Sequence, residues 1–141
     1  LQSIRAEIAR NREAALKHQR HLDAMAAAME RDNPPDAPPR PCSAWKGWSG
    51  TQEPMLLDTA YDVAIVTQAL AKMPFAQASR IGEVYGGQRY VQKVYDKLGA
   101  LLLNDQPMQL PNCAGIAREL ARSSGTLAAR YELLLQPYSM P

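Results

Sequence analysis

Two histidines and an aspartate near the start of the chain form the one cluster whose residue types could bind a metal ion. The pattern is His18-x-x-His21-x-Asp23, and ligands three residues apart on a helix can share a metal. A metal site needs three or four ligands, however, and on a helix His21 points about 60° away from the apolar face that carries His18. The spacing therefore favours a buried, hydrogen-bonded His18, and we predict no metal site and no cofactor.

Three polar side chains interrupt apolar stripes that are otherwise continuous. Asn11 and His18 lie in the stripe of the first helical segment, and Gln88 lies in that of a later one. A polar residue at such a position commonly determines helix register and partner choice, which is the interpretation that we favour. Alternatively, Asn11, His18 and Gln88 meet inside the fold and line a small polar cavity that binds a ligand, as the cores of helical bundles can.

Two tryptophans, Trp45 and Trp48, lie in a loop segment that also contains Gly47 and Gly50. An aromatic pair in such a loop could form an interaction surface for a sugar or a peptide. Tryptophans also pack readily against the end of a helical core, and the pattern favours this second role.

The sequence lacks the motifs of common enzyme classes. Ser123-Ser124-Gly125 is not a nucleophile elbow, no glycine-rich phosphate loop follows a strand pattern, and no pair of carboxylates shares a helical face without a basic neighbour. A formal net charge of +2 does not provide the strongly basic face of nucleic-acid-binding proteins. We therefore predict a protein that is not an enzyme and binds no nucleic acid.

Helical periodicity dominates the chain, and we predict a single all-α domain over residues 1–141. No alternating strand pattern is visible. The expected helices cover about residues 1–31, 58–72, 75–103 and 113–135, with a loop rich in proline and tryptophan at 33–57.

Three of these helices carry features that predict how they pack. In the first, a seam residue recurs every three or four positions from Leu1 to Met29, as in a packed helix. In the third, Gly86-Gly87 predicts a kink or the close approach of another helix. In the last, which Asn112 is expected to cap, the predicted seam comprises Ile116, Leu120, Ser123, Leu127, Arg130 and Leu134.

The two cysteines, Cys42 and Cys113, lie beside prolines at predicted helix boundaries, where a disulfide can form without distorting a helix. We predict that they are bonded, which indicates an oxidising compartment such as the periplasm. The bond would place the end of the first helix beside the start of the fourth, and the short loop at 104–112 keeps the third helix near both. The expected fold is an antiparallel up-down-up-down four-helix bundle, with both chain ends at the opposite pole.

The helical periodicity is already running at Leu1, and no capping residue precedes it. We therefore expect this domain to belong to a longer protein with a transmembrane helix upstream. Within the 141 residues themselves, no apolar run approaches the roughly 20 residues that span a bilayer.

Short motifs are spread along most of the chain. Residues 1–11 contain an acidic-aliphatic pair, Glu7-Ile8, followed by Asn11; a loop tryptophan (Trp45 or Trp48) precedes the segment 58–61, and Tyr85 follows Glu83-Val84. In these features the chain resembles a family of small bacterial single-pass membrane proteins of unknown function. The resemblance implies one amino-terminal transmembrane helix followed by a helical extracytoplasmic domain, and it implies no reaction, ligand or catalytic residue.

Together these features predict a non-enzymatic helical domain at the periplasmic face of a bacterial inner membrane, which contacts a protein partner or a second copy of itself. The alternative is a sensor domain that binds a small molecule inside the bundle. A cavity lined by Asn11, His18 and Gln88 would favour the sensor, whereas a solid core with an exposed apolar stripe would favour the interaction domain.

Overall fold

The computed structural model describes residues 1–32 and 37–136, which fold into four α-helices and two short 3-10 helices. The all-α class is as the sequence predicts. No strand occurs in these residues, although the backbones of Arg40 and Met108 form one isolated antiparallel bridge. The predicted proline-rich loop falls partly on residues 33–36, which lie outside the described residues. The helices are α1 (Gln2–Arg31), η1 (Cys42–Ala44), α2 (Thr59–Val66), η2 (Leu70–Lys72), α3 (Phe75–Leu103) and α4 (Leu110–Leu135).

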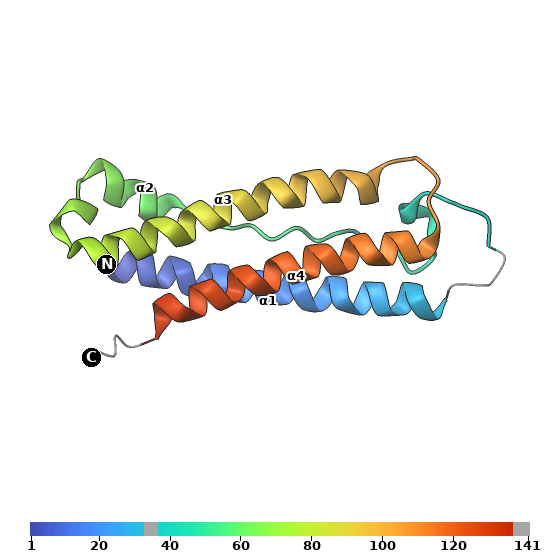
Figure 1. Ribbon diagram of the computed structural model, residues 1–141, viewed down its shortest axis with the longest axis horizontal. Helices are drawn as coiled ribbons and strands as arrows, with labels where there is room; N and C mark the ends of the chain where they lie inside the picture. The colour runs from blue at the N-terminus through green and yellow to red at the C-terminus, as the bar shows by residue number, and fades with distance from the viewer. Residues whose placement is uncertain (33–36, 137–141) are drawn as a thin grey trace.

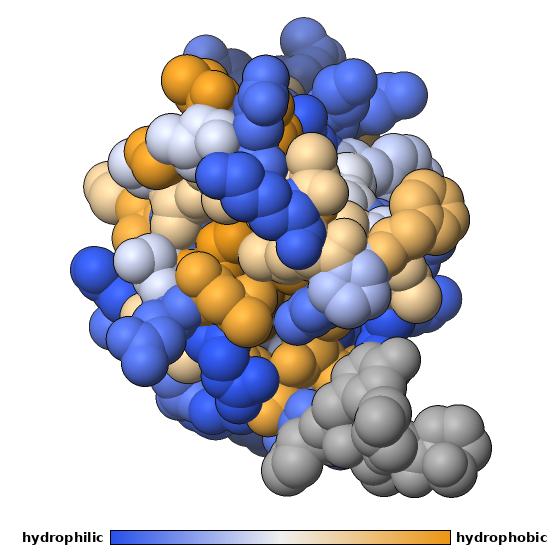
Figure 2. Space-filling view, turned by 90° about the vertical axis from the view of Figure 1, so that its left-hand side faces the viewer, coloured by the Kyte–Doolittle hydropathy of each residue, from blue (hydrophilic) through white to orange (hydrophobic). Residues whose placement is uncertain are grey.

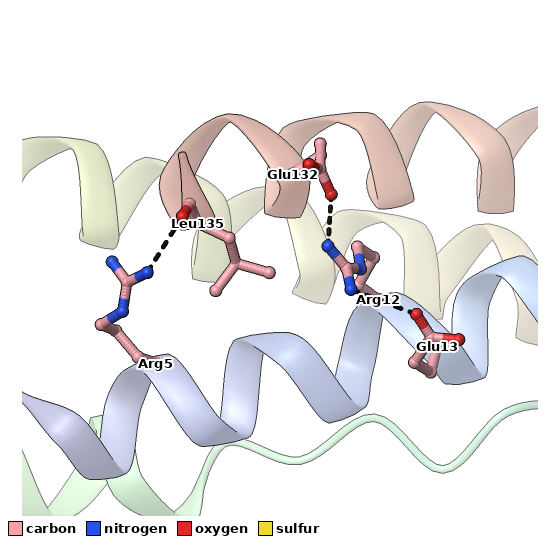
Figure 3. Close-up of polar contacts among 5 residues, drawn as sticks. All are labelled: Arg5, Arg12, Glu13, Glu132 and Leu135. Carbon is pink, nitrogen blue, oxygen red and sulfur yellow. Dashed lines mark hydrogen bonds and ion pairs between the residues drawn. The ribbon is translucent and has the colours of Figure 1, made fainter. Parts of the chain in front are cut away.

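The three long helices lie side by side along the long axis of the molecule, and α4 runs opposite to α1 and α3 (Figure 1). Polar contacts join α1 to α4 near both ends of this antiparallel pair. Near one end, Arg5 donates to the main-chain oxygen of Leu135 at 2.9 Å and Arg12 forms an ion pair with Glu132 (Figure 3). Near the other end, Arg118 of α4 donates to Glu30 of α1 at 2.7 and 2.9 Å. Arg5 is placed favourably, because its positive charge meets the negative end of the α4 dipole.

The seam of α1 is buried as predicted, apart from Leu1, which is 59% exposed. The predicted seam of α4 is correct at Leu120 and Leu127, but at its other inner positions the buried residue is the next one along the chain. Ile116 is only half-buried and Arg130 is exposed, because small residues on the neighbouring line let α4 lie close to α1. The buried line of α4 is Cys113, Ala117, Leu120, Ser124, Leu127 and Tyr131.

The second helix is shorter than predicted. We expected it to run to residue 72, but α2 ends at Val66, where the Thr67 hydroxyl donates to the Val63 carbonyl at 2.8 Å. Gln68 then adopts a φ of 61°, a left-handed conformation that stops the α-helix, and a single 3-10 turn follows. Before α2, the chain runs back along the bundle through residues 49–58, which are not helical (Figure 1). The described residues therefore form four α-helices, as predicted, but the second of them has only eight residues.

The last helix starts earlier than predicted. α4 begins at Leu110 with Gln109 in the capping position, so the prediction that Asn112 caps it is wrong. Pro111 lies in the first turn, where its missing N–H costs nothing and its fixed φ suits a helix.

None of the helices within residues 1–32 and 37–136 has the length and apolar character needed to cross a membrane.

Candidate functional site

A line of polar side chains on α1 faces the non-helical segment that returns along the bundle. The line comprises Glu7, Asn11 and His21, and it contacts the chain between residues 50 and 61. Backbone N–H and C=O groups in a buried, non-helical segment need partners from elsewhere. The polar residues of α1 supply several of them.

Asn11 and Gln88 meet, as one interpretation of the sequence required. Asn11 Nδ2 lies 3.1 Å from Gln88 Oε1, but it also donates to the Leu57 carbonyl at 2.7 Å. Asn11 Oδ1 accepts the Leu57 N–H at 2.8 Å, and Gln88 Nε2 donates to the Leu57 carbonyl at 3.2 Å. Tyr131 OH donates to Gln88 Oε1 at 2.5 Å. The two amides therefore bind each other and the protein's own backbone at Leu57.

His18 lies in a separate polar cluster. Its Nδ1 is 2.8 Å from Ser124 Oγ, and the same oxygen is 2.5 Å from Tyr95 OH. The rings of His18 and Tyr95 meet edge to face with centroids 5.0 Å apart. Burial lowers the pKa of His18 to about 4. The backbone of Thr51 has a smaller, opposite effect on this pKa. His18 is therefore neutral at pH 7 and works as an internal hydrogen-bonding group between α1, α3 and α4.

Glu7 caps α2 from a different helix. Its carboxylate accepts the N–H groups of Ala60 at 2.8 Å and Tyr61 at 3.4 Å, and the hydroxyl of Tyr85 at 2.6 Å. A negative charge at the first turn of a helix is favourable, because it meets unpaired N–H groups and the positive end of the dipole. Asp58, the residue at the local capping position, makes no side-chain capping bond.

The side chain of Tyr61, in the first turn of α2, packs against two side chains of α3. The rings of Tyr61 and Tyr85 stack with centroids 4.3 Å apart, and the Arg89 guanidinium lies 5.8 Å from the centre of the Tyr61 ring. Burial, followed by the hydrogen bond to Glu7, raises the pKa of Tyr85 well above its usual value. Tyr85 therefore stays a hydrogen-bond donor to Glu7 throughout the physiological pH range.

The outer surface of α2 exposes several apolar side chains. Only Ala64 of this helix is buried, whereas Val63, Ile65 and Val66 are all exposed, as is Phe75 at the start of α3. We call these four residues the α2 corner. They belong to elements that lie at one end of the molecule (Figure 1), and Figure 2 shows apolar side chains on that end among hydrophilic ones.

Cys42 and Cys113 form a disulfide at the opposite end of the molecule, as predicted, with Cα atoms 5.8 Å apart. We call this the disulfide end. Trp45 and Trp48 lie close by in sequence, and both are half-buried and packed against the core. Trp45 Nε1 donates to Asp32 Oδ2 at 3.2 Å. The geometry supports the packing role for both rings and leaves part of each exposed.

The other metal-type residues do not converge. His21 Nε2 lies 2.8 Å from the Gly50 carbonyl, away from the His18 cluster. In the part of the chain that the structure describes, no three residues among His, Cys, Asp and Glu gather as a metal would require.

Several residues of these clusters were missed by sequence analysis. Glu7 could have been found, because it lies four residues before Asn11 on the same helical face. Ser124 and Tyr131 were missed because the seam of α4 was placed one residue away. Leu57 and Ala60 take part through their backbones, and no side-chain pattern reveals that.

Comparison of the chain with protein-family models, with curated proteins and with solved structures finds no significant match.

Proposed function

We propose that this domain is a non-enzymatic protein-interaction domain and that the α2 corner is its contact surface. The observation that carries the proposal is the exposure of Val66 and Phe75, which are 82% and 87% exposed. Because Val63, Ile65 and Val66 are exposed, these three side chains of α2 do little for folding. Exposed apolar side chains gathered in one region gain free energy when a partner removes them from water.

The α2 corner is held in place before any partner arrives. Glu7 binds the backbone of Ala60, and the Tyr61 ring stacks on Tyr85. A surface fixed in this way loses little conformational entropy on binding. The exposed apolar side chains of α2 are therefore presented on a rigid support, which favours binding.

A second copy of the chain is the partner that we propose. Beside the apolar residues the surface carries both signs of charge, in an ion pair between Asp62 and Arg89, whose side chains are 56% and 54% exposed. A twofold axis places the same patch of each copy against the other, so a patch with both signs can pair with itself.

Sedimentation velocity tests this proposal over protein concentrations from about 5 to about 500 μM, which covers weak dimers. We expect a reversible dimer for the wild type and a monomer for the double variant Val66→Lys/Phe75→Lys. Leu103→Lys is the matched control, because Leu103 is 58% exposed at the far end of α3 (Figure 1). A wild type that stays monomeric throughout, or a control that dissociates the dimer equally well, would show that self-association through the α2 corner is wrong.

We also propose that the domain faces the periplasm of a bacterium and is anchored in the inner membrane by a preceding segment. The disulfide supports the compartment, because such bonds persist in oxidising environments. The resemblance of residues 1–11 to the helix that follows a membrane anchor supports the attachment. Thiol labelling of the denatured protein taken from intact cells tests the compartment. Two free thiols would contradict it.

A further inference from the structure

A pocket of about 360 Å³ lies at the disulfide end, between residues 37–46 and the start of α4. Its volume is at the lower end of the range typical of small-molecule sites. Most of its wall is apolar, as in sites that bind organic ligands rather than bare ions. The main apolar contributors are Pro38, Pro41, Trp45, Met108 and Leu110.

The two sides of this pocket come from distant parts of the sequence and are joined twice. The disulfide links Cys42 to Cys113, and the backbones of Arg40 and Met108 exchange two hydrogen bonds of 3.2 and 2.9 Å. Trp45 is held by its bond to Asp32 and by the main-chain bond from its N–H to the Cys42 carbonyl at 3.3 Å. The walls are therefore fixed before a ligand enters, which lowers the entropic cost of binding.

The charged residues that line the pocket give it a net positive charge, with two cations against one carboxylate. Arg40 and Lys46 both line the pocket, and neither forms an ion pair with any described residue. The one acidic residue of the lining, Asp32, accepts the hydrogen bond of Trp45. α4 begins at the pocket with Leu110 and has no side-chain cap, so the positive end of its dipole adds to the two cations.

We propose that this pocket binds a small aromatic carboxylate. The ring would lie against Trp45 and the apolar wall, and the carboxylate would pair with Arg40 and Lys46. The planar guanidinium suits a carboxylate, because it can donate two parallel hydrogen bonds. The α2 corner takes no part in this pocket, so the proposal stands or falls independently of the proposed self-association.

The indole N–H signals in a ¹H–¹⁵N spectrum provide the test, because the chain has only two tryptophans. The probes are 2-naphthoate and its uncharged analogue 2-naphthamide. We expect 2-naphthoate to shift the Trp45 indole signal with a Kd below about 1 mM, and 2-naphthamide to bind about tenfold more weakly or worse. The double variant Arg40→Gln/Lys46→Gln should bind both probes with the weaker affinity. Lys97→Gln, which removes an exposed charge from α3, should bind 2-naphthoate as the wild type does.

A glycine provides a second variant that separates the ring contact from the charge contact. A Cβ added at Gly47 would lie 2.5 Å from two atoms of the Trp45 ring, so Gly47→Ala must displace that ring. This variant should weaken the binding of both probes, whereas the charge variant weakens only that of 2-naphthoate. Three outcomes would overturn the proposal: no shift of the Trp45 signal at about 5 mM probe, equal affinities for acid and amide, or an unchanged affinity for 2-naphthoate in Arg40→Gln/Lys46→Gln.

Discussion

Asn11 of α1 and Gln88 of α3 are hydrogen-bonded to each other, and both donate to the main-chain oxygen of Leu57. Three segments that are distant in sequence thus meet at one acceptor. A helix in the place of residues 49–58 would have paired most of its own backbone groups, whereas an extended chain cannot. The polar residues in the seams of α1 and α3 supply hydrogen-bond partners that this extended segment cannot supply to itself.

Replacing Asn11 with leucine should destabilise the fold. The substitution removes the acceptor of the partly buried Leu57 N–H and one of the two donors to its carbonyl. We expect a loss of about 2–3 kcal/mol in the free energy of unfolding, measured by urea denaturation, because a buried polar group without a partner is costly. Asn112→Ala is the control: Asn112 is exposed and does not cap α4, so its loss should cost less than about 0.5 kcal/mol. Equal losses in the two variants would contradict the role of Asn11.

Replacing Glu7 with glutamine should loosen α2 more than the rest of the protein. The amide side chain lacks the negative charge that meets the N–H groups of Ala60 and Tyr61. We expect a loss of about 1–2 kcal/mol, together with faster hydrogen exchange of α2 amides than of α3 amides. Glu13→Gln tests the specificity, because Glu13 is also on α1 but is 62% exposed and, among the described residues, pairs only with Arg12. Unchanged exchange in α2 would exclude a capping role for Glu7.

The stability of the protein should depend on pH through His18. Burial lowers its pKa from 6.5 in the unfolded chain to about 4 in the fold. Between about pH 6.5 and pH 4 the unfolded state therefore binds more protons, and the free energy of unfolding falls by up to about 3 kcal/mol as the pH decreases through this window. Above pH 6.5 both states are neutral at this residue, and the contribution is fully retained.

Urea denaturation at a series of pH values measures this slope. His18→Gln removes the titrating group, so its free energy of unfolding should vary less between pH 6.5 and pH 4 than that of the wild type. Parallel curves for the two proteins would show that His18 does not cause the pH dependence.

Replacing Gly86 with alanine should stabilise α3. The helix runs through Gly86-Gly87 without a break, and a Cβ at Gly86 would meet nothing within 4 Å. Alanine should therefore add up to about 1 kcal/mol, visible as a rise in Tm of about 3 °C. Gly87→Ala should gain less, because its Cβ would lie 2.6 Å from Nη1 of Arg130, the side chain of α4 that approaches here. A lower Tm for Gly86→Ala than for the wild type would contradict the inference that position 86 has room for a side chain.

Long, uninterrupted periodicity allowed the sequence by itself to predict much of the fold. The predicted bounds of the first and third helices differ little from those of α1 and α3, since a seam repeated over many turns is averaged over many residues and Pro74 marks a clear start. The Cys42–Cys113 bond was also predictable, because the chain contains no other cysteines.

Only the tertiary structure decided the end of α2, the seam of α4 and the partners of the buried polar residues. The end of α2 depends on the left-handed backbone of Gln68, which a helix-forming sequence does not reveal. Small residues such as Ala117 and Ser124 are buried because α1 lies close, and that contact is absent from any local pattern. Asn11, Gln88 and Glu7 bind main-chain groups of Leu57 and Ala60, and every residue has the same main-chain groups. A main-chain group needs a side-chain partner when the fold leaves it without a main-chain one. That depends on the path of the chain through the fold and not on the residue types.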